Sequence, residues 1–363
     1  MYKKLLLTLN VLVTLWLLVA KICLQVPPQE WWFAGFITFL MPVALVLNFV
    51  LVLLWLWYKP FYAAFPLLVM LLLGEYYQRL FALNVASGPV PEGVQTLQVL
   101  SYNVRVFNIY GHLRDPDYRS TKEAIKWVAE HPADVYCLQE FYNDPNSDFL
   151  NTLNRIGVRY EKEMYMKVAL TNHIGAQFGM AIFSRYPVVN NGVISFGDST
   201  HNSAIFADVV VGPDTVRVYN CHLQSMSIEE RDIAETAKER SFFEKRGKEL
   251  MRRLKNGFVS RGIQTQLLLD HFKTCPYPFI LTGDFNDLPF SYTYEQLEEV
   301  LDNAFTTNGF GIGTTYNGML PFLRIDNQFY SPGLRNHSYQ THYDIGYSDH
   351  FPSSAVYSVS SEQ

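Results

Sequence analysis

An uncharged apolar stretch from Trp31 to Tyr58 constrains this chain more than any other feature of its sequence. A helix of that length can cross a bilayer hydrocarbon core of about 30 Å, even when it is tilted. A second apolar stretch, Leu5 to Ala20, follows Lys3 and Lys4. It resembles a signal-peptide core, but no small-residue cleavage site follows it, and a signal peptide would not explain the later stretch. We therefore predict membrane-spanning helices; helices buried in a soluble core are the alternative.

A third apolar segment, Phe61 to Leu73, is shorter than the other two. It spans the bilayer only if it continues toward Leu83, with Gln78 and Arg79 near the interface. Aromatic residues sit at the segment ends, as in an interfacial belt: Trp31, Trp32, Trp55, Trp57, Tyr58 and Tyr62. The sequence thus predicts a membrane region at residues 1–85 with two or three transmembrane helices.

Only a few charges bear on the orientation of this region. Lys3 and Lys4 favour a cytoplasmic N-terminus, and Lys59 favours a cytoplasmic loop after the second helix. Three crossings would place the rest of the chain outside the cytoplasm, whereas a re-entrant third segment would leave it inside. We expect an integral protein of the plasma or inner membrane whose larger domain lies on the non-cytoplasmic side.

Residues 86–95 contain Pro and Gly and are predicted to form a linker, and residues 96–363 are predicted to form one soluble domain. Short apolar runs rich in β-branched and aromatic residues predict buried strands. These runs are Leu97–Tyr102, Val135–Leu138, Met180–Phe183, Ala204–Val211, Val216–Cys221 and Phe279–Leu281. The net charge of −5 does not suggest a strongly basic surface for nucleic acid. The four cysteines lack metal-ligand spacing.

Two helical patterns interrupt the strands. The first is Ser120–Glu130, with Ser120 and Thr121 as candidate caps. The second, Ile228 to Phe272, mixes charged and apolar residues and predicts a solvated amphipathic helix pair. The alternative is an arm that lies along lipid headgroups. Such an arm would use three cations, Arg252, Arg253 and Lys255.

Polar side chains follow several of the predicted strands. They are Asn103, Glu140, His222, Asp284, Asn286, Asp326, Asp349 and His350. Each alone is weak evidence, because an Asn after a strand is usually a turn residue and a lone His is usually structural. Together, carboxylates and amides at the ends of core strands suit Mg²⁺ or Mn²⁺, which prefer oxygen ligands.

Seven blocks of sequence, in this order, resemble the endonuclease/exonuclease/phosphatase superfamily: YNVRVFN, DVYCLQE, FGMAIFSRYP, YNCHLQS, LTGDFND, RIDNQFY and YSDHFP. The likeness runs from about residue 96 to 357, and its most specific pieces are Gly-Asp-Phe-Asn and Ser-Asp-His. The superfamily includes secreted deoxyribonucleases, abasic-site endonucleases, inositol-polyphosphate phosphatases and neutral sphingomyelinases. The resemblance implies an α+β, four-layered DNase I-like fold, a β-sandwich of two sheets packed face to face with helices outside.

The resemblance also implies roles for the polar residues. Glu140 would be the principal ligand of Mg²⁺ or Mn²⁺, assisted by Asn103. Asp349 would lie near the metal or support a histidine. Asp284 would orient or deprotonate the attacking water, and Asn286 would bind a phosphate oxygen.

The two histidines complete the implied site. His350 would contact the scissile phosphate, and Asp326 would fix its tautomer. His222 matches the histidine that the nuclease and sphingomyelinase branches place beside the leaving group. Which histidine is acid and which is base stays open. Arg105 stands where abasic-site enzymes carry an acidic residue, and those enzymes lack a counterpart of His222, so a DNA-repair role is disfavoured.

The leading prediction is a metal-dependent phosphodiesterase or phosphatase that acts outside the cytoplasm. A phospholipid headgroup is one candidate substrate, because a tether raises the effective concentration of lipid. A membrane-tethered nuclease is the second hypothesis, which the negative net charge disfavours. The third is a non-catalytic binding module, which the presence of Glu140, Asp284 and His350 disfavours.

Overall fold

The computed structural model of the chain describes residues 2–84, 90, 93–113, 115, 117–197, 200–225, 240–318, 320 and 322–359. Most of the predicted linker and the beginning of the predicted helix pair lie outside these residues. The chain divides into two compact units. The first comprises Met1–Leu83, Ser225–Thr265 and Asp287–Glu299, and the second comprises Asn84–Gln224, Gln266–Asn286 and Val300–Gln363. The domain boundaries drawn from the sequence stay a prediction.

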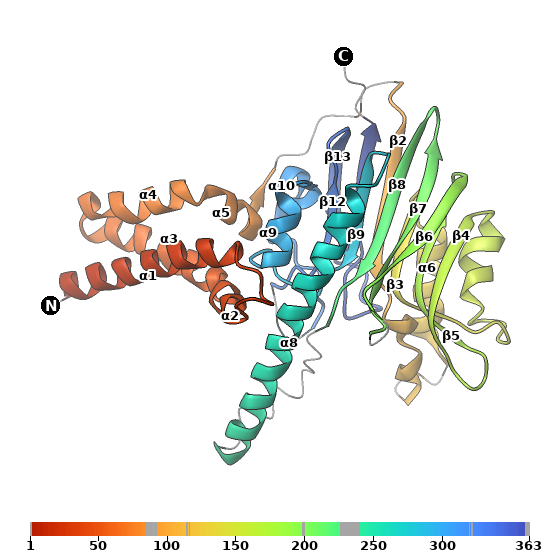
Figure 1. Cartoon of the computed structure of the whole chain (residues 1–363), viewed down its shortest axis with the longest axis horizontal. Coiled ribbons are helices and arrows are strands. Elements are labelled where there is room, and N and C mark those ends of the chain that lie inside the picture. The colour runs from red at the N-terminus through yellow and green to blue at the C-terminus, as the bar shows by residue number, and fades with distance from the viewer. Residues whose placement is uncertain are drawn as a thin grey trace. The chain divides into compact units, whose positions relative to one another are not determined.

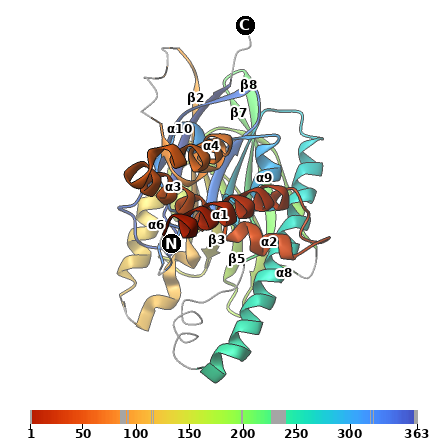
Figure 2. The same ribbon diagram turned by 90° about the vertical axis from the view of Figure 1, so that its left-hand side faces the viewer.

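The first unit is almost entirely helical, and its N-terminal helices face the reader in Figure 2. Its elements are α1 (Tyr2–Leu24), α2 (Phe33–Phe39), α3 (Met41–Tyr58), η1 (Pro60–Ala63), α4 (Ala64–Leu72), α5 (Gly74–Leu80), β1 (Ala82–Leu83), α8 (Arg240–Phe272) as far as Thr265, and α9 (Tyr292–Glu298). In the N-terminal helices one face packs inward, and the opposite face exposes large apolar side chains such as Leu15, Leu54 and Leu71. An apolar outer surface of this kind is typical of helices that contact lipid.

Two helical stretches of the described chain are long and apolar enough to cross a membrane. They are Tyr2–Leu24, with mean hydropathy 2.2, and Phe33–Tyr58, with mean hydropathy 2.6. Pro60–Leu72 and Gly74–Leu80 qualify only as a pair, and that pair is bent by 75°. Asn48, in the middle of α3, donates a hydrogen bond from Nδ2 to the Pro66 carbonyl at 3.0 Å, so a polar contact links α3 to α4.

Two buried arginines, Arg79 and Arg261, hold the segment Asp287–Glu299 within the first unit through ion pairs. Arg79 of α5 donates to Glu295 Oε2 at 2.7 Å and lies 2.8 Å from Glu298 Oε2. Arg261 of α8 donates from Nε to Asp287 Oδ2 at 2.9 Å, and its side chain is fully buried. Since an unpaired buried charge is costly, these pairs make the apolar N-terminal helices and this later segment interdependent.

The second unit contains most of the strands, shown in Figure 1. Its strands are β2 (Thr96–Asn103), β3 (Val135–Asn143), β4 (Glu163–Thr171), β5 (Gln177–Ser184), β6 (Val188–Ser195), β7 (Ser203–Val211), β8 (Asp214–His222), β9 (Phe279–Asp284), β10 (Asp302–Asn303), β11 (Phe310–Gly311), β12 (Asp326–Tyr330), β13 (Leu334–Thr341) and β14 (Ser353–Val359). Its helical elements are η2 (Arg105–Leu113), α6 (Arg119–Glu130), η3 (Leu153–Gly157), η4 (Val158–Tyr160), α10 (Ala304–Asn308) and the end of α8.

Twelve of these strands, all except β11, form two six-stranded sheets, ordered β10-β12-β9-β8-β7-β6 and β13-β14-β2-β3-β5-β4. Within them, β2 pairs with β3 in parallel and β8 pairs with β9 in parallel, while the other pairs are antiparallel. The inner faces meet in one apolar core, in which Val99 and Ile182 of one sheet join Val218 and Ile280 of the other.

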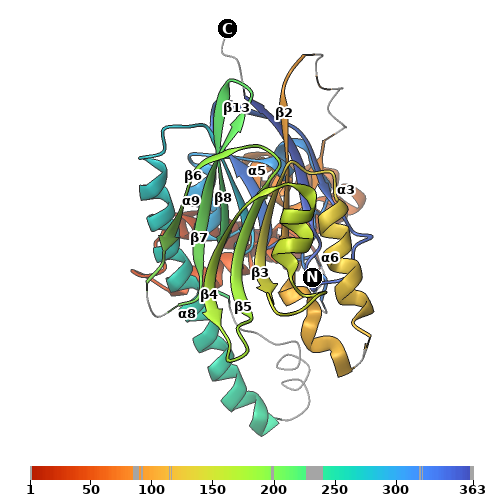
Figure 3. The same ribbon diagram turned by 90° about the vertical axis from the view of Figure 1, so that its right-hand side faces the viewer.

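Helices cover the outer faces of both sheets. Ala124, Ile125 and Val128 of α6 pack on β2, β3 and β5, and Figure 3 shows α6 beside these strands. On the other sheet, Phe272 at the end of α8 stacks against Phe279 and Tyr219 with ring centroids 4.7 and 5.1 Å apart. Helix, sheet, sheet and helix make four layers, so the predicted fold class is confirmed.

The structure confirms the first predicted helix, as α6, but corrects its cap. Helix α6 begins at Arg119 after Tyr118, which has a left-handed φ of 52° and makes no side-chain cap. Neither Ser120 nor Thr121 is the cap; instead the Asp115 carboxylate accepts from the N–H and hydroxyl of Ser120 at 2.7 and 2.8 Å. An anion at a helix N-terminus satisfies the same free N–H groups as a capping hydroxyl.

The second pattern gives one continuous helix in its described part, α8, rather than a pair. This helix is not simply solvated, because Arg261, Thr265 and Leu268 are fully buried. The lipid-headgroup arm stays a hypothesis: Lys255 lies 4.9 Å from the centre of the Trp32 ring, an arrangement common near membrane interfaces.

Acid is expected to loosen the second unit at His131. Burial, together with the charges of His342 and Lys162, lowers the pKa of His131 to about 4. A folded-state pKa below the usual value of about 6.5 means that the unfolded chain binds the proton first. Stability is therefore lost as the pH falls from about 6.5 to 4, by about 3 kcal/mol when complete. Hydrogen exchange of β3 in the full chain at pH 7 and pH 4.5 measures this loss.

The His131→Asn variant is the control. In the unmodified protein the Ala133 N–H donates to His131 Nδ1 at 3.2 Å. The asparagine side chain offers an acceptor to the same N–H, but it takes up no proton. The acid-dependent part of the exchange should shrink in this variant. An identical pH dependence in both proteins would show that His131 is not the cause.

Candidate active site

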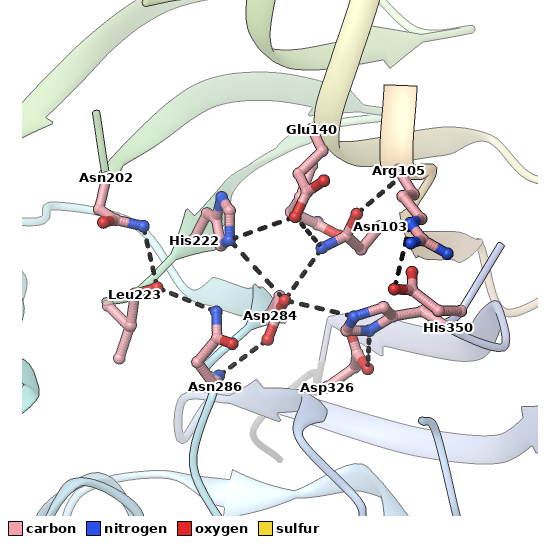
Figure 4. A network of polar contacts seen from close by, with 12 residues as sticks. Asn103, Arg105, Glu140, Asn202, His222, Leu223, Asp284, Asn286, Asp326 and His350 are labelled. Carbon is pink, nitrogen blue, oxygen red and sulfur yellow. Dashed lines mark hydrogen bonds and ion pairs between the residues drawn. The ribbon is translucent and has the colours of Figure 1, made fainter. Parts of the chain in front are cut away.

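Strand register brings the predicted polar residues together at one edge of the second unit. Asn103, His222 and Asp284 are the last residues of β2, β8 and β9. Pairing sets His222 opposite Asp284, and it sets Asp284 opposite Asp326, the first residue of β12. Because parallel neighbours end at the same edge, side chains that are far apart in the sequence meet there (Figure 4).

Asn103 joins two carboxylates. Its Nδ2 donates to Glu140 Oε1 at 3.1 Å and to Asp284 Oδ2 at 3.0 Å. Its Oδ1 accepts from the Arg105 N–H at 3.0 Å, which fixes the amide orientation because only an oxygen can accept there. The carbonyl of Asn103 accepts from Ser348 Oγ at 2.8 Å. This buried amide therefore holds Glu140 and Asp284 close together.

Glu140 occupies a strained backbone position. It lies in β3 where the pairing with β5 shifts between Leu138 and Phe141, and its φ is 48°. A bulge re-aims a side chain, and a left-handed glutamate within a strand is an outlier of the kind that clusters at functional sites. The Glu140 side chain is 39% exposed, in contrast to the buried Asp284.

His350 and Asp326 form a buried pair. His350 Nδ1 lies 2.8 Å from Asp326 Oδ2, and its Nε2 lies 3.7 Å from Asp284 Oδ2. The Asp326 backbone is held in turn, since its N–H donates to Thr315 Oγ1 at 3.0 Å. Because the carboxylate can only accept, the proton of this hydrogen bond belongs to Nδ1.

Electrostatics favour a charged His350. Burial by itself would lower the pKa of His350, but the charges of Asp326 and Asp284 outweigh burial and raise the pKa to about 10. Burial raises the pKa of Asp326 to about 6, against the opposing charge of His350. At neutral pH the pair is therefore imidazolium and carboxylate, and a proton on Nε2 faces Asp284.

His222 lies on the other side of Asp284. Its Nε2 is 3.8 Å from Asp284 Oδ2 and 3.9 Å from Glu140 Oε1. These separations exceed hydrogen-bond length, so the imidazole keeps its capacity for a bound group. The His222 side chain is mostly buried.

The turn after β9 shapes the floor of the site. Asn286, with a left-handed φ of 51°, donates from its backbone to Asp284 Oδ1 at 2.8 Å and from Nδ2 to the Leu223 carbonyl at 3.0 Å. Gly283 has a φ of 140°, and a side chain there would collide with the Cys221 carbonyl. The glycine before Asp284 is thus required by both φ and close approach. Phe285, between Asp284 and Asn286, is buried.

Asp349 faces Arg105 in the structure. Its Oδ2 lies 3.3 Å from Arg105 Nε, and the Ser348 hydroxyl donates to Oδ1 at 3.3 Å. The arginine noted in the sequence therefore serves as the counter-ion of Asp349. The role proposed for Asp349, near a metal or in support of His350, stays a prediction.

The donor set fits a hard divalent cation. Asp284, Asp326 and His350 each offer a ligand atom, and these three atoms lie within 4.8 Å of one another. A protonated His350, however, has no lone pair to give. The carboxylate oxygens of Glu140 and Asp284 suit Mg²⁺ or Mn²⁺ better than His350 does. Both carboxylates accept from the Asn103 amide, and the Glu140 side chain is accessible.

One neighbouring residue escaped the sequence analysis. Asn202 donates from Nδ2 to the Leu223 carbonyl at 2.9 Å, the same oxygen that Asn286 binds. It precedes β7 rather than following a strand, so a search for polar residues at the ends of strands does not find it.

Comparison with known families gives two matches. Residues 100–350 match the model of the endonuclease/exonuclease/phosphatase family. Residues 3–80 match a domain of unknown function. None of the curated proteins compared with this chain matches it.

Solved structures share the fold at low sequence identity. An endonuclease/exonuclease/phosphatase from Bacteroides vulgatus is 16% identical, with a TM-score of 0.53, over 73% of this chain and 99% of that one. A family protein from Bacteroides thetaiotaomicron is 17% identical, with a TM-score of 0.53, over 74% and 99%. A mannosyl-6-phosphatase of Bacteroides thetaiotaomicron is 19% identical, with a TM-score of 0.50, over 71% and 98%.

Proposed function

Since this chain belongs to the endonuclease/exonuclease/phosphatase family, we propose that it is a membrane-anchored hydrolase of phosphate esters that depends on Mg²⁺ or Mn²⁺. One observation carries the proposal: two carboxylates and two imidazoles converge on one point, with Asp284 Oδ2 within 3.8 Å of both histidines. Hydrolysis of a phosphate ester needs a base for water, positive charge on the phosphate oxygens and a proton for the leaving oxygen.

Each residue has a separate task in this proposal. Glu140, assisted by Asn103, would hold the cation, which when bound neutralises charge on the phosphate. Asp284 accepts the proton of the attacking water. His350, kept protonated by Asp326, donates from Nε2 to a phosphate oxygen.

The remaining residues act on the other side of the phosphate. His222 protonates the leaving oxygen, and the Asn286 amide orients the phosphate. Asp349 anchors Arg105 at the rim.

The packing of the N-terminal helices supports placing the catalytic domain outside the cytoplasm. Lys3, near the start of α1, lies 4.6 Å from the Tyr62 ring, and Lys21, near its end, lies 3.2 Å from Glu75 Oε1. The third segment thus runs alongside α1 from one end to the other, which favours three crossings over a re-entrant loop. The expected result is that a reporter fused after Gln363 is found outside the cytoplasm, and a cytoplasmic reporter would reverse the assignment.

Lipid headgroups are the substrates that such an anchor favours, because both partners are confined to one surface. The deciding measurement uses the full chain in lipid nanodiscs, with Mg²⁺ or Mn²⁺, against phospholipids, plasmid DNA, RNA and an aryl phosphate. We expect hydrolysis of phosphate monoesters or lipid phosphodiesters, abolished by EDTA and restored by Mg²⁺. Preferential cleavage of DNA or RNA would instead support a tethered nuclease.

The metal assignment is tested separately. Glu140→Gln should raise the Mg²⁺ concentration needed for half-maximal activity by at least about tenfold, because an amide binds a hard cation more weakly than a carboxylate does. Glu130→Gln, at the exposed end of α6, is the matched control. Unchanged Mg²⁺ dependence in Glu140→Gln would remove Glu140 as the ligand.

A further inference from the structure

A hollow of about 210 Å³ opens beside Glu140 and His222, and no role in hydrolysis accounts for it. Its lining residues are Val106, Glu140, Lys167, Ala169, Leu170, Phe178, Gly179, Met180, His201, Ser203 and His222. Most of this wall is apolar. Lys167 is the cation that enters the hollow from a strand, and His201 enters it from the loop before β7.

Two irregularities of the sheet form this hollow. The pairing of β4 with β5 shifts between Val168 and Leu170, and the pairing of β3 with β5 shifts beside Glu140. Gly179 of β5 lies at both shifts, and a side chain on it would collide with the Lys167 carbonyl. Bulges that flank a strand bend its neighbours, so the sheet is built to leave space next to the candidate metal ligand.

Lys167 has the character of an anion-binding residue. It pairs across the strands with Met180, so the two side chains share the face that lines the hollow. Among the described residues its ammonium group has no hydrogen bond or ion pair, although the residue is partly buried. Burial lowers the pKa of Lys167, as expected for a cation without a counter-charge. A partly buried ammonium group that has no counter-charge and lies beside apolar walls is suited to bind an anion.

We propose that this hollow binds the part of the substrate beyond the scissile phosphate, and that it selects a single ring-sized body carrying a second anionic group, which Lys167 pairs with. The proposal rests on the phosphoesterase function proposed above. The volume suits one ring, since a cavity of about 150 Å³ accommodates benzene. Leu170, Phe178 and Met180 would contact the body of the ligand, and the scissile phosphate would lie beside Glu140, which also lines the hollow.

The test compares two esters that differ in one charge, 4-carboxyphenyl phosphate and 4-methylphenyl phosphate. For the full chain in nanodiscs, kcat/KM should favour the carboxylate by about 10- to 100-fold, the range of a charge-assisted hydrogen bond. This ratio should fall to near 1 in Lys167→Met and remain above about 5 in Lys167→Arg. Lys126→Met, on the exposed face of α6, should keep the wild-type ratio. A wild-type ratio near 1, or a ratio unchanged in Lys167→Met, overturns the proposal.

A binding measurement separates this proposal from the proposed function. Calorimetry with Mg²⁺ compares 4-carboxyphenylphosphonate and 4-methylphenylphosphonate, which cannot be hydrolysed. Tighter binding of the carboxylate that is lost in Lys167→Met supports the subsite even if neither ester is turned over, in which case only the proposed function fails. Equal affinity of the two, including no binding of either, overturns the subsite.

Vesicles distinguish a soluble ligand from a lipid headgroup. Phosphatidylserine and phosphatidylethanolamine differ in one carboxylate, so they repeat the comparison on a membrane. Preference for phosphatidylserine that depends on Lys167 assigns the subsite to a headgroup. Preference confined to the soluble pair assigns it to a soluble ester.

Discussion

Replacing Asp284 by asparagine is expected to lower kcat at least about 1,000-fold, because one oxygen of this residue serves the whole site. Asp284 Oδ2 accepts from Asn103 at 3.0 Å and lies 3.7 Å from His350 Nε2 and 3.8 Å from His222 Nε2. An asparagine either points an NH₂ group at these donors or turns its oxygen toward them. In both cases the base that accepts the proton of water is lost.

The fold should survive this change. Asp284 is buried beside two other carboxylates, Glu140 and Asp326, so removal of its charge relieves repulsion. We expect an unchanged or higher melting temperature together with the loss of turnover. The control is Asp302→Asn in β10, an exposed carboxylate of the same sheet, which should retain wild-type activity. If Asp284→Asn kept more than a tenth of the activity, the base would have to be sought elsewhere.

Arg79→Met should destabilise the protein by about 3 to 5 kcal/mol, the usual cost of leaving a buried charge without its partner. Arg79 is 5% exposed and contacts Glu295 and Glu298 at 2.7 and 2.8 Å. It also lies 4.5 Å from the Tyr76 ring. Methionine fills much of the same volume but leaves both carboxylates without this cation. Thermal unfolding of the full chain in detergent measures the loss.

The chain offers a matched control for this experiment. Lys21 pairs with Glu75 at 3.2 Å in the same unit, but both side chains are about half exposed. Lys21→Met should cost under about 1 kcal/mol, because water screens exposed pairs. The double variant Arg79→Met/Glu295→Gln should recover part of the lost stability. Equal effects of Arg79→Met and Lys21→Met would show that burial does not set the strength of these pairs.

The ion pairs of Arg79 join the N-terminal region to a segment much later in the sequence. Glu295 and Glu298 lie beyond Asp284 in the sequence, yet their cation comes from the apolar N-terminal region. A fragment that lacks residues 1–83 would lose the Arg79 cation that pairs with both carboxylates. The apolar N-terminal helices, which are candidate membrane spans, are therefore also part of a folded unit.

Some features followed from the sequence because their physical causes are local. The length and apolarity of Tyr2–Leu24 and Phe33–Tyr58 are sufficient to identify candidate spans. Short apolar runs rich in β-branched and aromatic residues marked the core strands, and the polar residues after those strands lie together in the structure. The cap of α6 was not predicted correctly. The sequence pattern favoured Ser120, whereas the Asp115 carboxylate, which lies before the helix, accepts a hydrogen bond from Ser120.

Other features depended on pairings that no local pattern contains. The sequence did not predict that the Asn103 amide bridges Glu140 and Asp284, because that bridge requires the register of two sheets. The left-handed φ of Glu140 comes from a bulge against β5, and the hollow at Lys167 comes from a second bulge. A bulge removes local strand pairing, and only tertiary contacts offset that loss. A strand-like sequence therefore does not reveal a bulge.

By itself the sequence determined the candidate membrane spans, the layered α+β fold and the set of polar residues at the strand ends, because hydrophobic length and period are properties of the chain alone. The tertiary structure decided which of those residues are joined by a hydrogen bond, as His350 and Asp326 are, and which charges are buried, as Arg79 and Glu295 are. These outcomes depend on distance and burial, and both are set only when distant segments pack together.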